Sequence, residues 1–145
     1  MKRDGCPIGK IQHNNKCMPL KDYLEEYIIA YDFEKIKPGT IDFMKKNPVI
    51  IYYYPDRNPG HLAECQCIDE YCWMNFFKKT KHQPKKMLLS AFAHELAHIK
   101  EILARKEKGQ EIDPSDATER RAIHFTNRLP LPGYTQKAWY RGVPE

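Results

Sequence analysis

The chain has 145 residues, with 24 lysines and arginines against 19 acidic residues and a formal net charge of +5. This length fits one domain with its own hydrophobic core, and no apolar run approaches the roughly 18 residues that a transmembrane helix needs. The first residues lack the apolar segment of a secretory signal, so we expect a cytoplasmic protein whose five cysteines are free or metal-bound rather than disulfide-bonded. The modest charge is spread along the chain and favours solubility more than nucleic-acid binding.

The N-terminal third predicts small hairpins and helices. Turn-forming residues dominate 1–18, where Cys6 and Cys17 enclose a segment typical of a turn-rich knuckle or small hairpin. Apolar residues at helical spacing predict an amphipathic helix over 20–31, and a second short helix over 39–46 ends before Asn-Pro.

Three strands should follow, over Val49–Tyr54, His61–Ile68 and Tyr71–Lys78. The connections between them are short, which favours antiparallel pairing. The segment Lys78–Lys86 then places five lysines in nine residues. We interpret it as a solvated loop; the functional alternative is a basic rim that steers an acidic substrate or DNA.

A long helix over 85–108, capped by Gly109, carries the sequence His94-Glu95-Leu-Ala-His98. On a helix the two histidines lie on one face, one turn apart, so both imidazoles can bind one zinc ion. Glu95 lies beside them and could act as general base toward a water molecule. The flanking residues are apolar nearly all round, so the helix should be buried, and buried histidines need partners or an ion.

A third ligand is expected on the next helix. Asp113 and Pro114 are typical of a helix start, and Glu119 shares an otherwise apolar face with residues three, four and seven positions on. His124 points about 140° away from Glu119, so both cannot face the same metal. We therefore predict Glu119 as the ligand.

These two segments resemble the ImmA/IrrE family of zinc metallopeptidases. The matching motifs are His94-Glu95-x-x-His98 and Glu119-Arg-Arg-Ala-x-x-Phe-x-x-x-Leu-x-x-Pro132, and the likeness spans about 49–132. Thr126 stands where a second alanine is usual, and Pro130-Leu131-Pro132 replaces the usual Leu-Met-Pro.

The resemblance implies that zinc is held by His94, His98 and Glu119, that Glu95 is the catalytic glutamate, and that the substrate is a regulatory protein, often a DNA-binding repressor. It also implies an edge strand that holds the substrate as an added strand, either His61–Ile68 or Tyr71–Lys78.

The expected fold class is α+β and zincin-like, with a small antiparallel three-stranded sheet packed on the active-site helix and on the downstream helix that carries the glutamate. We expect one domain, 1–145, with a cysteine-containing segment at 1–18, a catalytic core at 49–132 and a tail at 133–145. Tyr134 and Tyr140 in the tail could stabilise an oxyanion, although packing is the simpler role for them.

Further alternatives remain open. A second, structural zinc could be bound by a cysteine- and histidine-rich cluster; its members would be Cys65, Cys67, Cys72 and His61. The whole chain could instead be a non-catalytic, zinc-stabilised module that binds nucleic acid or protein. It could also be a SprT-like DNA-associated protease, which would use a third histidine downstream.

Overall fold

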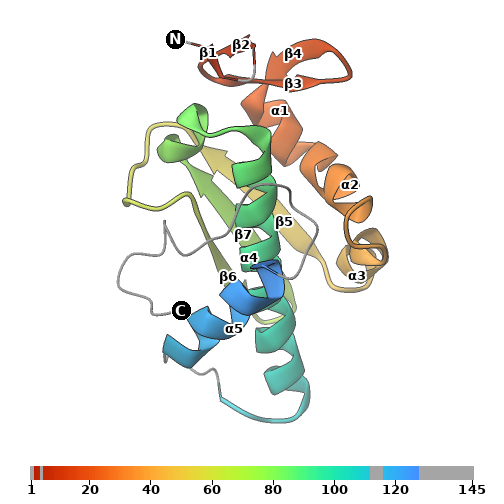
Figure 1. The fold of residues 1–145 in the computed structure, drawn as a ribbon. Helices are drawn as coiled ribbons and strands as arrows, with labels where there is room; N and C mark the ends of the chain where they lie inside the picture. The colour runs from red at the N-terminus through yellow and green to blue at the C-terminus, as the bar shows by residue number, and fades with distance from the viewer. Residues whose placement is uncertain (1, 4, 112–115, 128–145) are drawn as a thin grey trace.

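The computed structural model describes residues 2–3, 5–111 and 116–127. In chain order, its elements are β1 (Lys2–Arg3), β2 (Cys6–Pro7), β3 (Lys10–His13), β4 (Lys16–Pro19), α1 (Leu20–Glu25), α2 (Ile28–Glu34), α3 (Thr40–Lys46), β5 (Val49–Tyr54), β6 (Ala63–Ile68), β7 (Tyr71–Phe77), the 3-10 helix η1 (Lys78–His82), α4 (Lys85–Glu107) and α5 (Asp116–Asn127) (Figure 1). The described chain is therefore a mixed α+β structure, as expected.

The N-terminal segment forms two small antiparallel pairs, β1 with β2 and β3 with β4. Asn14 and Asn15 both have positive φ, 51° and 63°, at the turn between β3 and β4. Asparagine tolerates this conformation, which two-residue hairpin turns require. A disulfide between Cys6 and Cys17 joins β2 to β4. The predicted hairpin is confirmed.

The helix predicted over 20–31 is wrong in one respect, because it is broken in two. Tyr27 between α1 and α2 has φ 64°, a left-handed conformation that ends one helix before the next begins. Its hydroxyl donates a hydrogen bond to the carbonyl of Val49 at 2.9 Å. The break therefore turns the ring of Tyr27 toward the sheet. Tyr31, which the predicted helical face included, is 56% exposed.

The three strands form one sheet in the order β5-β7-β6, and the all-antiparallel prediction is wrong for one pair. β6 and β7 are antiparallel, whereas β5 and β7 are parallel. Each connection reverses the chain direction, so β5 and β7 run the same way. Because β7 rather than β6 lies beside β5, their pairing must be parallel.

The two edges of this sheet differ. On β5, the backbone N–H of Tyr53 donates to the Glu25 carboxylate of α1 at 2.9 Å, and the Val49 carbonyl accepts from Tyr27. On the other side, β6 is the outer strand of the sheet in the part of the chain that the structure describes, and it is paired only with β7. An outer strand edge of this kind presents unpaired N–H and C=O groups, which can pair with another extended chain.

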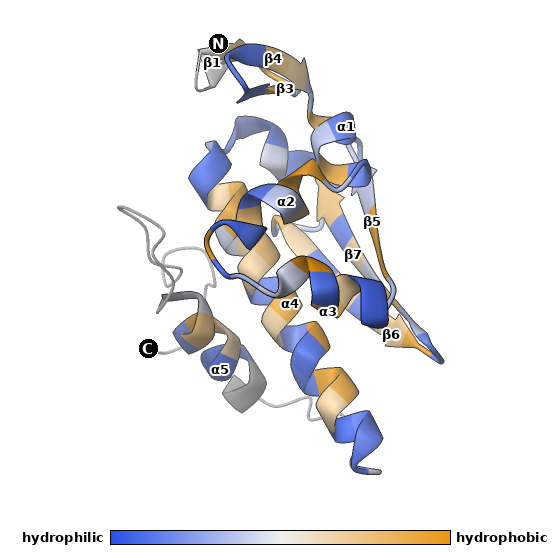
Figure 2. Cartoon of the chain, turned by 90° about the vertical axis from the view of Figure 1, so that its right-hand side faces the viewer, coloured by the Kyte–Doolittle hydropathy of each residue, from blue (hydrophilic) through white to orange (hydrophobic). Residues whose placement is uncertain are grey.

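Helix α4 is the central element. It packs against β6 on one side and α5 on the other, and the two ribbon views agree that it lies between the sheet and α5 (Figures 1 and 2). Its middle section is buried nearly all round, from Leu88 to Ile99. Gly109 has φ 71° directly after this helix, as predicted for its C-terminal cap. No described helix has the length and apolar character to cross a membrane.

Candidate metal centre

The paired histidines lie in the buried middle of α4. His94 is fully buried and His98 is 9% exposed. Their rings are 4.7 Å apart between centroids, in an edge-to-face arrangement, and their Nε2 atoms are 3.1 Å apart. The four-residue spacing therefore brings both nitrogens to one point, as the helix geometry predicts.

Helix α5 brings Glu119 to the same point. Its Oε2 lies 2.9 Å from His94 Nε2, and its Oε1 lies 2.8 Å from His98 Nε2. In the described part of the chain, these residues form the one group of three or more histidine, cysteine or acidic side chains whose donor atoms all lie within 4.8 Å of one another. The helix that begins at Asp116 thus presents the predicted carboxylate; the predicted start at Asp113–Pro114 lies outside the described residues.

The donor set fits a zinc ion. Zinc binds imidazole nitrogens and carboxylate oxygens at about 2.0–2.2 Å with tetrahedral angles, which places two donors about 3.3 Å apart. The two imidazole nitrogens are 3.1 Å apart, and each lies within 2.9 Å of a different oxygen of the Glu119 carboxylate. The side chains would have to move apart slightly to take their places around an ion.

A charged clamp holds α5 against α4 beside this group. Arg121 of α5 donates from Nε to Glu101 Oε1 at 2.6 Å and from Nη2 to Oε2 at 3.0 Å. Two parallel hydrogen bonds from one guanidinium fix both the distance and the orientation of the pair. On the same helix, Ala122, Ile123 and Thr126 are buried. This face of α5 therefore packs on α4, and Glu119, which shares the face, lies opposite the two histidines.

The electrostatics of the metal-free group are those of a carboxylate shared by two imidazoles. Burial opposes the charge on Glu119, but the hydrogen bonds from His94 and His98 hold the pKa of its carboxyl far below the usual range. Burial likewise opposes a charge on His98, yet its hydrogen bond to Glu119 leaves the pKa of His98 raised. Glu119 thus carries the negative charge that a divalent cation requires, whereas the His98 ring must lose its proton before it can bind a metal.

Glu95 lies next to His94 but does not belong to the donor group. It is 4% exposed, and this burial raises the pKa of its carboxyl. Cys65 of β6, the strand that packs on α4, lies near it, because burial and the charge of the Glu95 carboxylate raise the pKa of the Cys65 thiol. The sequence had suggested Cys65 only as a ligand of a second metal, so this proximity was missed. The strand alternation that directs Cys65 toward α4 was the available signal.

The remaining histidine of this region lies elsewhere. His124 of α5 is exposed and is not in the donor group. This agrees with the predicted angle between His124 and Glu119. A third histidine ligand, as in SprT-like proteases, is therefore not supplied by His124.

The cysteine prediction needs correction. Cys67 and Cys72 are directly opposite each other on β6 and β7 and form a disulfide, as do Cys6 and Cys17. The Cys67–Cys72 pair is oxidised and offers no thiolate to a metal. His61, the fourth proposed ligand, lies 3.4 Å from Glu64 instead. The second zinc site is not formed by these residues, and the expectation that all five cysteines are free or metal-bound is wrong.

Two other predicted features lie apart from the described site. Tyr134 and Tyr140, the suggested oxyanion residues, lie outside the described residues together with the tail at 133–145. The basic segment Lys78–Lys86 is not a simple loop, because η1 occupies its first half and α4 begins at Lys85. Within this segment, the Lys85 ammonium lies 3.5 Å from the Asp32 carboxylate of α2. One of the positive charges of the segment therefore forms an ion pair inside the chain.

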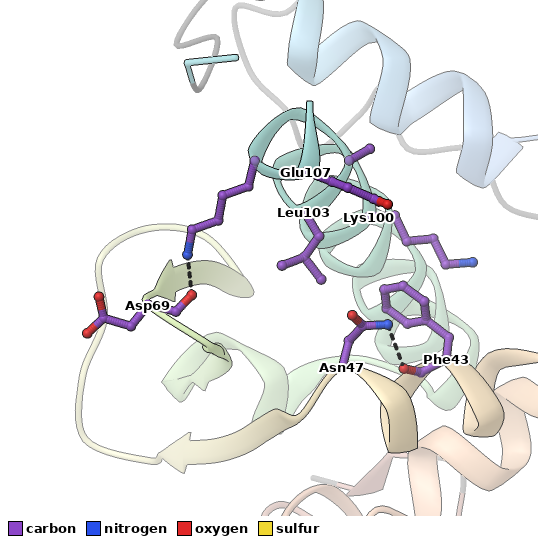
Figure 3. Close-up of a pocket in the computed structure, with 8 residues that line it drawn as sticks. Phe43, Asn47, Asp69, Lys100, Leu103 and Glu107 are labelled. Atoms are coloured by element: carbon purple, nitrogen blue, oxygen red, sulfur yellow. Dashed lines mark hydrogen bonds between the residues drawn. The ribbon is translucent and has the colours of Figure 1, made fainter. Parts of the chain in front are cut away.

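A hollow of about 500 Å³ lies on another side of α4, between the end of α3 and the turn that joins β6 to β7. Figure 3 shows Leu103 at its centre, with Phe43 and Asn47 on one side and Asp69 on the other. Lys100 in its lining follows His98 by two residues, about 200° around the helix. The lining contains none of the three metal-binding candidates and mixes both signs of charge, so the hollow is separate from the centre described above.

Comparisons of the chain with family models, curated proteins and solved structures return no match.

Proposed function

We propose that the protein is a zinc-dependent endopeptidase, similar to the ImmA/IrrE family, that cuts a regulatory protein of the repressor type. The observation that carries the proposal is the convergence of His94, His98 and Glu119 within 4.8 Å, with the buried Glu95 on the same helix. This combination of three ligands and an adjacent carboxylate is the one that hydrolytic zinc sites use.

In this proposal, three residues bind the metal and a fourth transfers protons. A bound zinc ion supplies Lewis-acid chemistry, lowering the pKa of water and polarising the scissile carbonyl. His94, His98 and Glu119 would hold the ion. Glu95 accepts a proton from the attacking water and later gives it to the leaving amine. Burial raises the pKa of the Glu95 carboxyl, which brings it nearer to the range in which a group can both take and return a proton.

Substrate binding is assigned to the outer edge of β6. This strand packs on α4 and has a free edge among the described residues, whereas the β5 edge is capped by Tyr27 and Glu25. An extended peptide that adds to β6 as a further strand gains backbone hydrogen bonds without needing a particular sequence. Of the two strands considered from the sequence, β6 is the one whose position supports this role, because β7 is central.

The test is cleavage of a random peptide library by the zinc-loaded protein, read by mass spectrometry of the new termini. The wild type should cut, and Glu95→Gln should bind zinc with the same affinity yet cut nothing, because the amide accepts no proton. Cleavage by Glu95→Gln at the wild-type rate would remove Glu95 from the mechanism. Tight zinc binding with no cleavage by the wild type would favour the non-catalytic binding module instead.

A further inference from the structure

Each residue of β6 directs its backbone groups either to β7 or to the free edge of the sheet. The N–H of Phe77 in β7 donates to the carbonyl of Leu62 at 2.9 Å, and the strand register places these two residues opposite each other. In an antiparallel pair, hydrogen-bonded positions of this kind alternate with positions at which neither residue bonds across the pair. The register runs without a bulge from Ala63 to Ile68, so the alternation extends along the whole strand. The residues whose backbone groups point to the free edge are therefore Ala63, Cys65 and Cys67.

A second observation fixes the same alternation. The Cα atoms of Cys67 and Cys72 are 4.0 Å apart, which is close to the roughly 4.5 Å of a non-hydrogen-bonded pair and well short of the roughly 5.5 Å of a hydrogen-bonded one. The N–H of Cys72 donates instead to the carbonyl of Pro48, directly before β5, at 3.2 Å. The backbone groups of Cys67 thus point away from β7, toward a side on which the described part of the chain has no further strand.

The side chains of β6 that face away from α4 differ from one end of the strand to the other. Glu64, Gln66 and Ile68 are exposed and alternate with the residues that face α4. The Glu64 side chain is 48% exposed, and its carboxylate lies 3.4 Å from the His61 ring, which is 41% exposed. Ile68 is 48% exposed and is directly opposite Tyr71, which is 49% exposed. The outward face of the strand therefore carries an acid toward one end and an exposed apolar pair at the other.

A peptide strand that adds to this edge would place its own side chains beside these residues. Opposite charges that face each other across two strands are stabilising and like charges are destabilising, and large apolar side chains gain by covering one another. In an antiparallel addition, the positions opposite Glu64 and Ile68 are the non-hydrogen-bonded ones, at which side chains lie closest. Because Glu64 and Ile68 are four residues apart on one face, their partners in the peptide are also four residues apart, whichever way the peptide runs.

We propose that β6 selects extended segments that carry a lysine or arginine opposite Glu64 and, four residues away, a large apolar side chain opposite Ile68. This selectivity rests on the proposed function and names the substrate class of the same site. The backbone groups of Ala63, Cys65 and Cys67 bind any extended peptide, and the two outward side chains choose among peptides.

The experiment selects binders from a random peptide library on zinc-loaded Glu95→Gln protein, in which retained peptides are not cut. Sequencing should show lysine or arginine enriched at one position and leucine, isoleucine or an aromatic residue enriched four positions away. Glu64→Lys should exchange the basic preference for an acidic one, and Ile68→Thr should remove the apolar preference alone. In a single selected peptide, replacement of the basic residue by alanine should raise Kd by about 1.4- to 5-fold.

Glu26→Lys is the matched control, because it makes the same change of charge at an exposed residue that ends α1, away from β6. It should leave both preferences as they are. Retained peptides without two preferences four residues apart overturn the proposal, and so does a Glu26→Lys variant that changes the basic preference as Glu64→Lys does.

Cleavage by the wild type separates this selectivity from the proposed function. If the wild type cuts peptides that lack the two spaced preferences as fast as peptides that have them, the selectivity of β6 is overturned and the peptidase remains. If peptides with the spaced preferences are retained and the wild type cuts none of them, the peptidase is overturned and β6 remains a selective peptide-binding edge.

Discussion

Replacement of Glu119 by glutamine gives the sharpest test of the metal centre. The substitution preserves the size of the side chain but replaces a charged ligand by an amide. Glu119 supplies one of three donors and lies 2.9 and 2.8 Å from the two histidines. Glu119→Gln should therefore lose most of the zinc affinity while His94 and His98 stay in place on α4.

The effect can be measured as a change in thermal stability. An ion that binds only the folded protein stabilises it by about 2.7 kcal/mol when its free concentration is one hundred times Kd. For a chain of this size, each kcal/mol moves Tm by about 2–4 °C, so zinc should raise the wild-type Tm by about 5–11 °C. Glu119→Gln should show little of this shift at the same zinc concentration.

Differential scanning fluorimetry with and without zinc measures both proteins. Glu95→Gln is the matched control, because it makes the same chemical change next to His94 in a residue that is not in the donor group. It should keep the full zinc-dependent shift. If Glu119→Gln keeps the shift as well, residue 119 is not a ligand and the reasoning from the geometry of the site is refuted.

Three further outcomes follow from the structure. Phe92→Ala should lower the free energy of unfolding, measured in urea, by about 3–5 kcal/mol, because Phe92 is fully buried and its ring centroid lies 5.1 Å from that of Phe33. A loss of less than about 1 kcal/mol would contradict this packing. Arg121→Met should weaken zinc binding in a calorimetric titration, because the ion pair between Arg121 and Glu101 orients α5. The same substitution should change the free energy of unfolding of the metal-free protein by about 1 kcal/mol or less, because this ion pair is partly exposed. Unchanged zinc affinity would show that the ion pair does not position Glu119. In the metal-free protein, the stabilisation from the Glu119–His98 pair should be greatest between about pH 4.5 and 6.5. The lowered pKa of Glu119 makes its contribution fade as pH falls below 4.5, and the raised pKa of His98 makes its contribution fade as pH rises above 6.5. A stability difference between the wild type and Glu119→Gln that does not vary with pH would contradict this prediction.

The sequence predicted the parts of the site that depend on local geometry. The i, i+4 spacing of His94 and His98 requires their side chains to share one helix face, whatever the surroundings. The apolar flanks predicted that this helix is buried, and the angular offset of His124 from Glu119 predicted which of the two faces the histidines.

Tertiary structure decided what local patterns cannot encode. The order β5-β7-β6 depends on which strand inserts beside β5, and the parallel pairing follows from that order. The oxidation of Cys67 depends on the register that sets it opposite Cys72. The proximity of Cys65 to Glu95, thirty positions further along the chain, depends on how β6 packs on α4. Periodicity gives the direction of a side chain relative to its own element, whereas the distance to a partner on another element is set only when the two pack.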